Sequence, residues 1–129
     1  MHESHRIRAV HAYLPKEFNR YKIQTAFNNG IADCYYVGKR DALWIEYKQT
    51  VMPKRDKTLI KPNLSSLQLK FLTAHITADL NAWVIVFTNE GHIILNDHQH
   101  WTDGITAETA RFYLKSYKEL ANAILQTVN

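Results

Sequence analysis

The chain has 129 residues, of which 46% are hydrophobic, and a formal net charge of +4. This length fits one domain, residues 1–129, with a hydrophobic core of its own. No apolar run approaches the ~18–20 residues of a membrane-spanning helix, and no N-terminal stretch is typical of a signal peptide. The single cysteine, Cys34, excludes an internal disulfide framework. We therefore expect a soluble, cytoplasmic protein with no membrane partner and a buried, structural Cys34 thiol.

The first half of the chain predicts a helix followed by three strands. Ile7, Val10 and Leu14 recur at helical spacing and predict a helix over 3–14, which Pro15 ends. Alternating apolar residues and turn residues then predict an antiparallel meander. Its strands and turns fall, in order, at 21–27, 28–30, 31–37, 38–41 and 42–49.

The second half predicts a long loop, two more strands and two helices. Residues 51–63 are polar, basic and broken by two prolines, which indicates a functional loop. Ser65 and Gln68 match a capping box at the start of a helix. The apolar stripe of this helix comprises Leu64, Leu67, Phe71, Leu72, Ile76 and Leu80. Two strands, 83–87 and 92–95, and one C-terminal helix from Thr106 follow, the helix with a stripe of Tyr113, Tyr117, Leu120 and Ile124.

Three charged side chains fall where two neighbouring strands can bring them together. Residues i and i+2 of a strand share a face, so Glu46 and Lys48 point the same way, and a hairpin would bring Asp33 beside them. Two adjacent carboxylates repel each other, and a divalent cation removes that cost. Hard carboxylate oxygens suit Mg²⁺ or Mn²⁺. Lys48 would add a fixed positive charge beside a phosphate.

These residues resemble the PD-(D/E)XK nuclease superfamily, in which an acidic residue on one strand precedes a D/E-x-K triplet on the next. The resemblance narrows to the VRR-NUC type, which includes small stand-alone nucleases of phages and bacteria. Four stretches carry it, roughly from Glu3 to Phe87: Glu3 in a helix that ends at Leu14-Pro15, then 29–33, 43–48 and 64–68. Ala32 stands where the family often has proline.

The resemblance implies an α/β (α+β) fold with a restriction-endonuclease-like αβββαβ core, a mixed sheet flanked by helices. The further strand and C-terminal helix would be additions to it. By the same resemblance, Asp33, Glu46 and the Tyr47 carbonyl would hold the metal, with Glu3 as a further candidate. Lys48 and Gln68 would serve catalysis. The implied activity is a Mg²⁺- or Mn²⁺-dependent endonuclease acting on branched DNA as a homodimer, as Holliday junction resolvases do.

Basic residues concentrate before and within the long loop. Seven of the 16 lysines and arginines lie between positions 39 and 61. Phosphate contacts from such a loop give affinity without reading sequence. The loop residues that we expect to contact DNA are Lys54, Arg55, Lys57 and Lys61; the alternative is a solvated surface loop.

Other interpretations of the same residues remain open. Asp33 could belong to a turn, Glu46 and Lys48 to a solvent-facing strand, and Gln68 to its own helix cap. Glu3 could be an exposed first-turn acid, with Glu17 as a weaker substitute. His92, His98 and His100 match no zinc pattern and indicate surface or packing roles. Tyr113 and Tyr117 indicate core or a dimer interface.

The alternatives extend to function. A nonspecific nicking or flap nuclease would use the same site on a different substrate. A nucleic-acid-binding module with a vestigial site would bind without turnover. A structural protein with a solvated acidic pair would show no metal-dependent change in stability.

Overall fold

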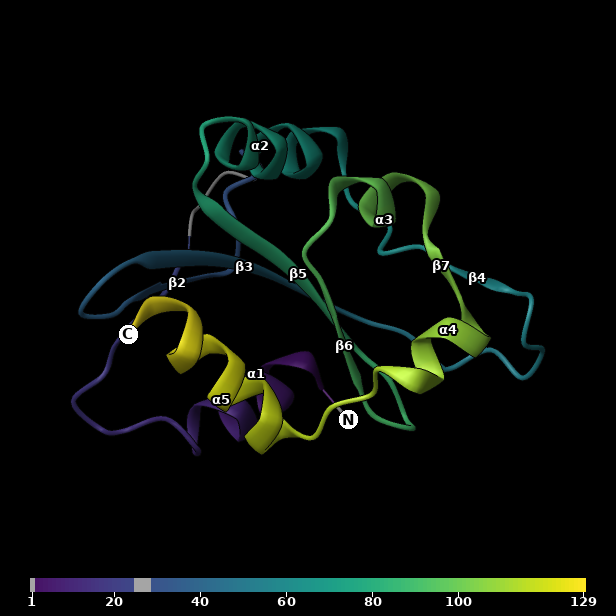
Figure 1. Cartoon of the computed structure of the whole chain (residues 1–129), viewed down its shortest axis with the longest axis horizontal. Coiled ribbons are helices and arrows are strands. Elements are labelled where there is room, and N and C mark those ends of the chain that lie inside the picture. Colours follow the sequence, from purple (N-terminus) through teal and green to yellow (C-terminus); the bar gives the residue numbers. More distant parts are fainter. Residues whose placement is uncertain (1, 25–28) are drawn as a thin grey trace.

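Five strands form a mixed sheet around which the helices are arranged (Figure 1). The computed structural model describes residues 2–24 and 29–129. The elements in chain order are α1 Glu3–His11, β1 Asn19–Lys22, β2 Cys34–Val37, β3 Ala42–Gln49, β4 Leu59–Ile60, α2 Ser66–Thr77, β5 Asn81–Phe87, β6 His92–Leu95, α3 His98–Asp103, β7 Ile105–Thr106, α4 Ala107–Phe112 and α5 Tyr117–Val128. No helix within the described residues is long and apolar enough to cross a membrane.

The sheet has the order β1-β2-β3-β5-β6. The strands β1, β2 and β3 pair antiparallel, which confirms the predicted meander. β5 joins β3 in parallel, because α2 carries the chain from one end of the sheet back to the other, and β6 closes the sheet as an antiparallel edge strand. The apolar run of β5 is buried along almost its whole length, as a central strand requires.

Helices cover both faces of the sheet. α1 and α5 pack together and against β3 on one face, and α2 lies on the opposite face against β5 (Figure 1). Alternation along β3 divides its side chains between these faces: Ile45 and Tyr47 belong to the core under α1 and α5, whereas Trp44 packs in the second core under α2. Glu46 and Lys48 therefore project toward the α2 side, away from the α1–α5 core.

The predicted first strand differs from the observed one at both ends. β1 begins at Asn19 rather than Tyr21, because its register with β2 pairs Asn19 with Val37. It ends at Lys22; residues 25–27 of the predicted strand and Asn28 of the predicted turn lie outside the described residues. β2 begins at Cys34 rather than Ile31, since the Ile31 N–H is turned toward the Asn29 side chain.

Other boundaries were also wrong. The first helix ends at His11, three residues short, where turn hydrogen bonds replace the helical ones. The predicted loop 51–63 contains β4, which pairs with β7 in a small second sheet. In α2 the predicted stripe fails at Leu67 and Leu80, which are 47% and 54% exposed, and Leu80 lies beyond the helix.

The predicted C-terminal helix is two helices. α4 ends at Phe112, and α5 starts after Ser116, whose hydroxyl accepts a hydrogen bond from the Glu119 N–H in a capping box. Tyr113 lies in the break and is 64% exposed, which excludes the core and leaves the dimer interface as the remaining prediction for it, whereas Tyr117 packs against the core. α3 was not predicted.

Candidate active site

Asp33, directly before β2, lies next to Glu46 of β3. The β2–β3 register pairs Cys34 with Ile45, so the next pair outward is Asp33 and Glu46. The Asp33 carbonyl accepts a hydrogen bond from the Ile23 N–H at 2.8 Å, and its Oδ2 accepts one from the Tyr47 N–H at 2.8 Å. Two strands thus hold the backbone and the side chain of Asp33 beside Glu46.

Glu46 is a buried carboxyl group, only 3% exposed. Burial, and next the Asp33 carboxylate, raise the pKa of Glu46 to about 8, with Lys48 opposing the change. Burial also raises the pKa of Asp33, against the Tyr47 N–H that stabilises its charge. The two carboxyl groups lie close enough to form a hydrogen bond when one is protonated. Burial and mutual repulsion therefore oppose the ionisation of both groups together, and the Lys48 ammonium offsets part of that cost.

Lys48 and Gln68 complete the polar cluster beside Glu46. Lys48 Nζ lies 3.7 Å from Glu46 Oε2 and donates a hydrogen bond to Gln68 Oε1 at 3.0 Å. Gln68 Nε2 donates to the same Glu46 oxygen at 3.0 Å. The Lys48 side chain keeps a quarter of its surface exposed, whereas the Glu46 side chain is almost fully buried.

Gln68 also caps its own helix. Its N–H donates to the Ser65 hydroxyl at 3.1 Å, and its Oε1 accepts from the Ser65 N–H at 3.0 Å. The two interpretations of Gln68 are thus combined: the cap orients the amide group, and the amide group contacts Glu46 and Lys48. Gly30, with φ +82°, lies against the first turn of this helix, where a Cβ would overlap the Leu67 carbonyl. That close approach brings the start of α2 over the β2 end.

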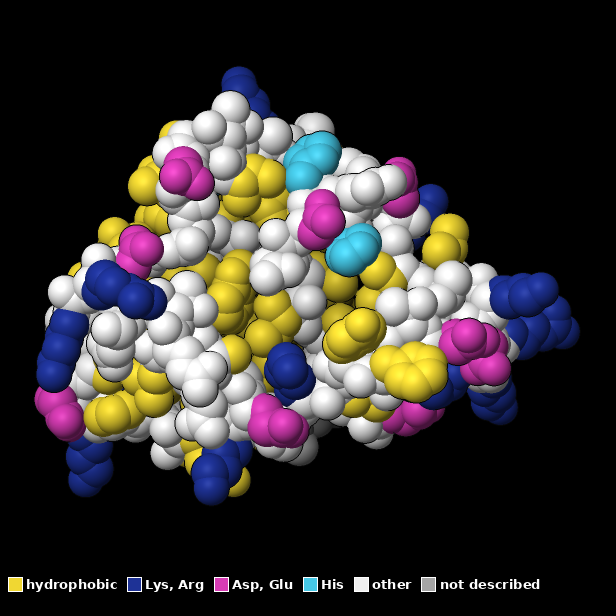
Figure 2. Space-filling view, in the orientation of Figure 1, with side chains coloured by type: hydrophobic (Ala, Val, Ile, Leu, Met, Phe, Trp, Pro, Cys, Tyr) yellow, Lys and Arg dark blue, Asp and Glu magenta, His cyan; other side chains and the backbone are white. Residues whose placement is uncertain are grey.

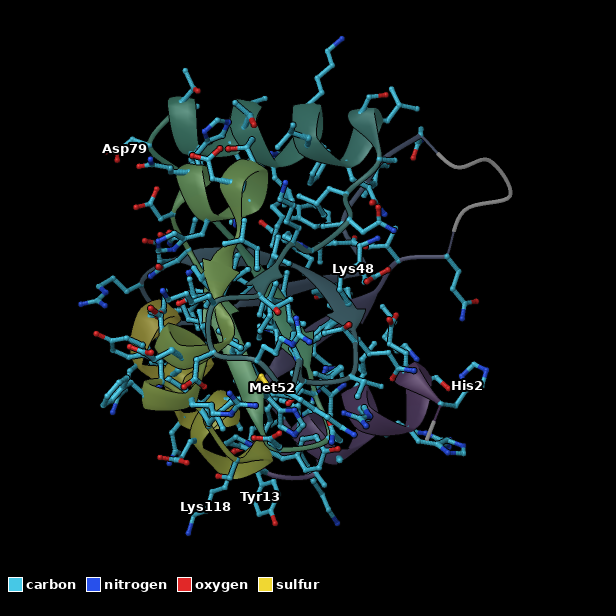
Figure 3. The ribbon with its side chains drawn as sticks, turned by 90° about the vertical axis from the view of Figure 1, so that its right-hand side faces the viewer. His2, Tyr13, Lys48, Met52, Asp79 and Lys118 are labelled. Atoms are coloured by element: carbon cyan, nitrogen blue, oxygen red, sulfur yellow. The ribbon has the colours of Figure 1, made fainter. Side chains whose placement is uncertain are left out.

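Glu3 lies at the edge of this cluster. It begins α1 and is half-buried. Burial and the Asp33 carboxylate raise the pKa of Glu3, and Lys48 and His2 lower it. Figure 3 shows Lys48 between α2 and the N-terminal end of α1, where His2 is labelled. The first helix therefore contributes a third carboxyl group, Glu3, to the electrostatics of the cluster. Glu17, the weaker substitute, lies between α1 and β1.

The donor set fits a hard divalent cation. Glu46 Oε1 is buried and has no hydrogen-bond partner, which is the kind of orphaned oxygen that an ion satisfies. Within residues 2–24 and 29–129, no group of three or more His, Cys, Asp and Glu side chains is arranged to hold an ion. Asp33 and Glu46 would thus act with backbone oxygen or water, and Mg²⁺ typically retains waters beside one or two carboxylates.

The predicted DNA-contact residues lie on exposed backbone before and after β4, in residues 54–61, here called the basic turn. Lys54, Arg55, Lys57 and Lys61 are all exposed. Lysine and arginine side chains, with acidic ones among them, gather at the end of the molecule that carries β4 (Figure 2). β4 is paired to β7, and the N–H groups of Ala107 and Glu108 donate to carbonyls of Thr58 and Asp56 at 2.9 and 3.0 Å.

Arg111, which no sequence pattern had indicated, fixes this turn from α4. Its guanidinium donates to Asp56 Oδ1 at 2.9 Å, Glu90 Oε1 at 3.2 Å and the Pro53 carbonyl at 2.6 Å. No local pattern marks a single arginine at a helix end as the anchor of a loop more than fifty residues away.

The remaining candidates lie outside the polar cluster. The buried Cys34 agrees with the prediction. His92 is buried and stacks on Tyr117, with ring centroids 4.5 Å apart. His98 and His100 belong to α3, where Asp97 caps the helix through the Gln99 N–H.

Comparison with known proteins adds information about the fold. No protein-family model and no curated protein sequence matches the chain. Among solved structures, it is similar to Hjc, a Holliday junction resolvase from the archaeal hyperthermophile Archaeoglobus fulgidus, with a TM-score of 0.58 and 14% identity. The match covers 95% of this chain and 98% of that one. The chain therefore has an α+β fold with a restriction-endonuclease-like core, as the sequence predicted.

Proposed function

We propose that this protein is a Mg²⁺- or Mn²⁺-dependent endonuclease that cleaves branched DNA. The observation that carries the proposal is the cluster of Asp33, Glu46, Lys48 and Gln68, with the orphaned Glu46 oxygen at its centre. The fold shared with a Holliday junction resolvase supports the substrate class. The spacing of Asp33 and Glu46-Tyr47-Lys48 supports membership of the PD-(D/E)XK superfamily, and the surrounding motifs favour the VRR-NUC type.

Each residue has a distinct role in this proposal. Asp33, Glu46 and the Tyr47 carbonyl hold the cation, with Glu3 adding negative charge from α1. The cation, when bound, offsets carboxylate repulsion and stabilises the charge that develops on a phosphate oxygen. Lys48 holds a positive charge beside the acidic pair, where a phosphodiester would lie. Gln68 orients both the Lys48 ammonium and the Glu46 carboxylate through hydrogen bonds.

The basic turn supplies affinity in this proposal. Lys54, Arg55, Lys57 and Lys61 would contact phosphates along the DNA backbone, which positions the duplex without selecting a sequence. In Figure 3 the β4–β7 end faces the viewer and Lys48 lies to one side of it. A homodimer would place two such sites across a junction, and cytoplasmic DNA would be the target.

A cleavage assay on a panel of DNAs tests the proposal. Four-way junctions, flaps and linear duplexes would be incubated with Mg²⁺ or Mn²⁺, with Glu46→Gln as the inactive control. Faster cleavage of junctions is the expected result. A preference for flaps, or equal nicking of all forms, would retain the nuclease and change its substrate. Binding without metal-dependent cleavage would instead support a vestigial site. Wild-type rates in Asp33→Asn or Glu46→Gln would overturn the assigned site.

A further inference from the structure

Aromatic rings form a row on the same sheet face as the acidic pair. Tyr21 of β1, Tyr35 of β2 and Trp44 of β3 are direct partners in the strand register. Their neighbouring ring centroids are 6.3 Å and 4.4 Å apart. Phe71 of α2 packs edge-on against Trp44 at 5.1 Å. The row thus runs from α2 across three strands to the open edge of the sheet.

This row lies two residues along the strands from the acidic pair. Tyr35 follows Asp33 by two residues, and Trp44 precedes Glu46 by two, which corresponds to about 7 Å along each strand. Contacts from α2 confirm that the face is shared, because Gln68 reaches Glu46 and Phe71 reaches Trp44. A nucleotide beside the site would therefore find the row next to it.

The inner rings of the row pack against the hydrophobic core, whereas the outer rings are partly exposed to solvent. Trp44 and Phe71 pack against the second hydrophobic core. Tyr35 is half-buried, and Tyr21 at the sheet edge is 51% exposed. α2 packs against β5, so β1 extends beyond its cover. Leaving an aromatic ring half in water beside a polar site forgoes burial that a core residue would gain.

Positive charge lies beyond the acidic pair on the same sheet face as the rings. Lys48 follows Glu46 by two residues and Trp44 by four, so all three share this face. Lys22 alternates with Tyr21 on β1 and pairs with Cys34 of the α1–α5 core, so it belongs to the opposite face. Exposed aromatic rings near a cation are typical of surfaces that bind unpaired nucleotides, because the rings stack on bases and the cation neutralises a phosphate. Paired bases inside a duplex are already stacked and present no free face.

We propose that Tyr21 and Tyr35 form a stacking platform for an unpaired nucleobase next to the acidic pair. This inference rests on the proposed function and deepens it, since it makes the unpaired bases at a branch or gap the feature that the protein recognises. Phosphate contacts from the basic turn hold any duplex, whereas the platform favours DNA in which a base is free to leave its stack. Base–aromatic stacking tolerates all four bases, so recognition of this kind selects structure and not sequence.

Binding to two DNAs of equal length tests the platform. One is a fully paired duplex, and the other carries a short single-stranded gap. Both would be titrated by fluorescence anisotropy with protein in a Glu46→Gln background, so that no cleavage intervenes. The variants are Tyr21→Leu and Tyr35→Leu, which remove the aromatic ring but keep an apolar side chain. Tyr21→Phe and Tyr35→Phe are the matched controls, because they keep the ring.

The leucine variants should lose about 5-fold or more in affinity for gapped DNA, while their affinity for paired duplex changes less than about 2-fold. The phenylalanine controls should bind both DNAs like the parent. A 2-aminopurine in the gap should be quenched by the parent protein and much less by Tyr21→Leu. Since Tyr21 is exposed, that variant decides the question even if Tyr35→Leu does not fold.

Equal losses on both DNAs, or unchanged affinity for gapped DNA, would overturn the platform. Two further outcomes distinguish failure of the platform from failure of the proposed function. Parent protein that binds neither DNA overturns the proposed function and the platform together. Parent protein that binds gapped DNA with no dependence on the tyrosine rings, while the protein that retains Glu46 cleaves DNA, overturns the platform alone.

Discussion

Gln68 connects α2 to the centre of the sheet, because its amide group donates a hydrogen bond to Glu46 Oε2 at 3.0 Å while its backbone N–H is capped by Ser65. One side chain thereby links the start of a helix to a buried carboxylate. The orientation of the carboxylate and the stability of the helix end depend on the same residue.

A matched pair of substitutions separates these two roles. Ser65→Ala and Gln68→Ala each remove part of the capping box, and each should cost about 0.5–2 kcal/mol of unfolding free energy. Only Gln68→Ala removes the contacts to Glu46 and Lys48, so only that variant should lose cleavage, by about 10-fold or more. Chemical denaturation and single-turnover cleavage are the measurements. Equal activity in the two variants would restrict Gln68 to its helix.

Positioning of the basic turn can be distinguished from its charge. Arg111→Gln lowers the net charge by one, whereas Asp56→Asn raises it by one, yet both break the 2.9 Å ion pair between them. If the pair positions the turn for DNA, both variants should bind DNA about 2- to 5-fold more weakly. Affinity would be measured by anisotropy at fixed salt. Opposite changes in the two variants would show that charge alone matters.

The number of phosphate contacts is a separate question. Replacing Lys54, Arg55 and Lys57 together should weaken DNA binding and flatten the dependence of log affinity on log salt, because fewer counterions are released. The magnitude of this slope should fall by about 0.9 for each phosphate contact that is lost, for up to three contacts. An unchanged slope would remove the turn from the DNA interface while leaving the acidic cluster untouched.

Protonation of His11 should destabilise the fold at low pH. Its Nε2 lies 2.7 Å from the Tyr36 hydroxyl, which in turn lies 2.7 Å from the Tyr47 hydroxyl. Burial, followed by the charges of Arg20 and Lys22, lowers the pKa of His11 to about 4. The unfolded chain binds the proton more tightly than the folded one. The stability that the folded state gains from holding His11 neutral is therefore fully present above about pH 6.5, and it is lost as the pH falls toward 4.

His11→Asn keeps a polar group at this position but cannot titrate in that range. The difference in unfolding free energy between wild type and His11→Asn should narrow by about 1–2 kcal/mol between pH 7 and pH 4, after allowance for solvent screening. Urea denaturation at several pH values, without added metal, measures it. A difference that stays constant over this range would mean that His11 is not held neutral.

Gly30 is the position where the site is least tolerant of an added side chain. It has a left-handed backbone, and a Cβ would overlap the Leu67 carbonyl at the start of α2. Gly30→Ala should destabilise the fold by about 2 kcal/mol or more and displace Gln68 from Glu46. Denaturation midpoints and cleavage rates would be compared. A cost below about 0.5 kcal/mol would show that α2 moves away freely.

The sequence predicted the elements that carry the acidic cluster better than the rest of the fold. β3 lies between two turn signals in the sequence, and its residues 42–49 were predicted with both boundaries. α3 was missed because Trp101 is its buried residue and a single apolar position makes no stripe. β4 and β7 are two residues each, too short for any periodicity. The break before α5 had a local signal, the Ser116 and Glu119 capping box, but the continuous apolar stripe obscured it.

The cluster was predictable to the extent that alternation and hairpin pairing fix which residues share a face. Asp33, Glu46 and Lys48 follow from that rule. Gln68 was placed there only by the family resemblance, since the capping box by itself predicts a contact within its own helix. The aromatic row does not, because Tyr21 meets Tyr35 only in the observed register of β1. Arg111 acts across three separate segments, and only the folded chain brings them together.

Mn²⁺ titration by calorimetry tests the central claim most directly, because it asks whether Asp33 and Glu46 share a cation. Wild-type protein should bind Mn²⁺ and melt at a higher temperature in its presence. Glu46→Gln should lose the binding heat and the metal-dependent rise in melting temperature, while Lys48→Ala should retain both and lose turnover. Equal Mn²⁺ binding by wild type and Glu46→Gln, or none by wild type under conditions that support cleavage, would contradict the assignment.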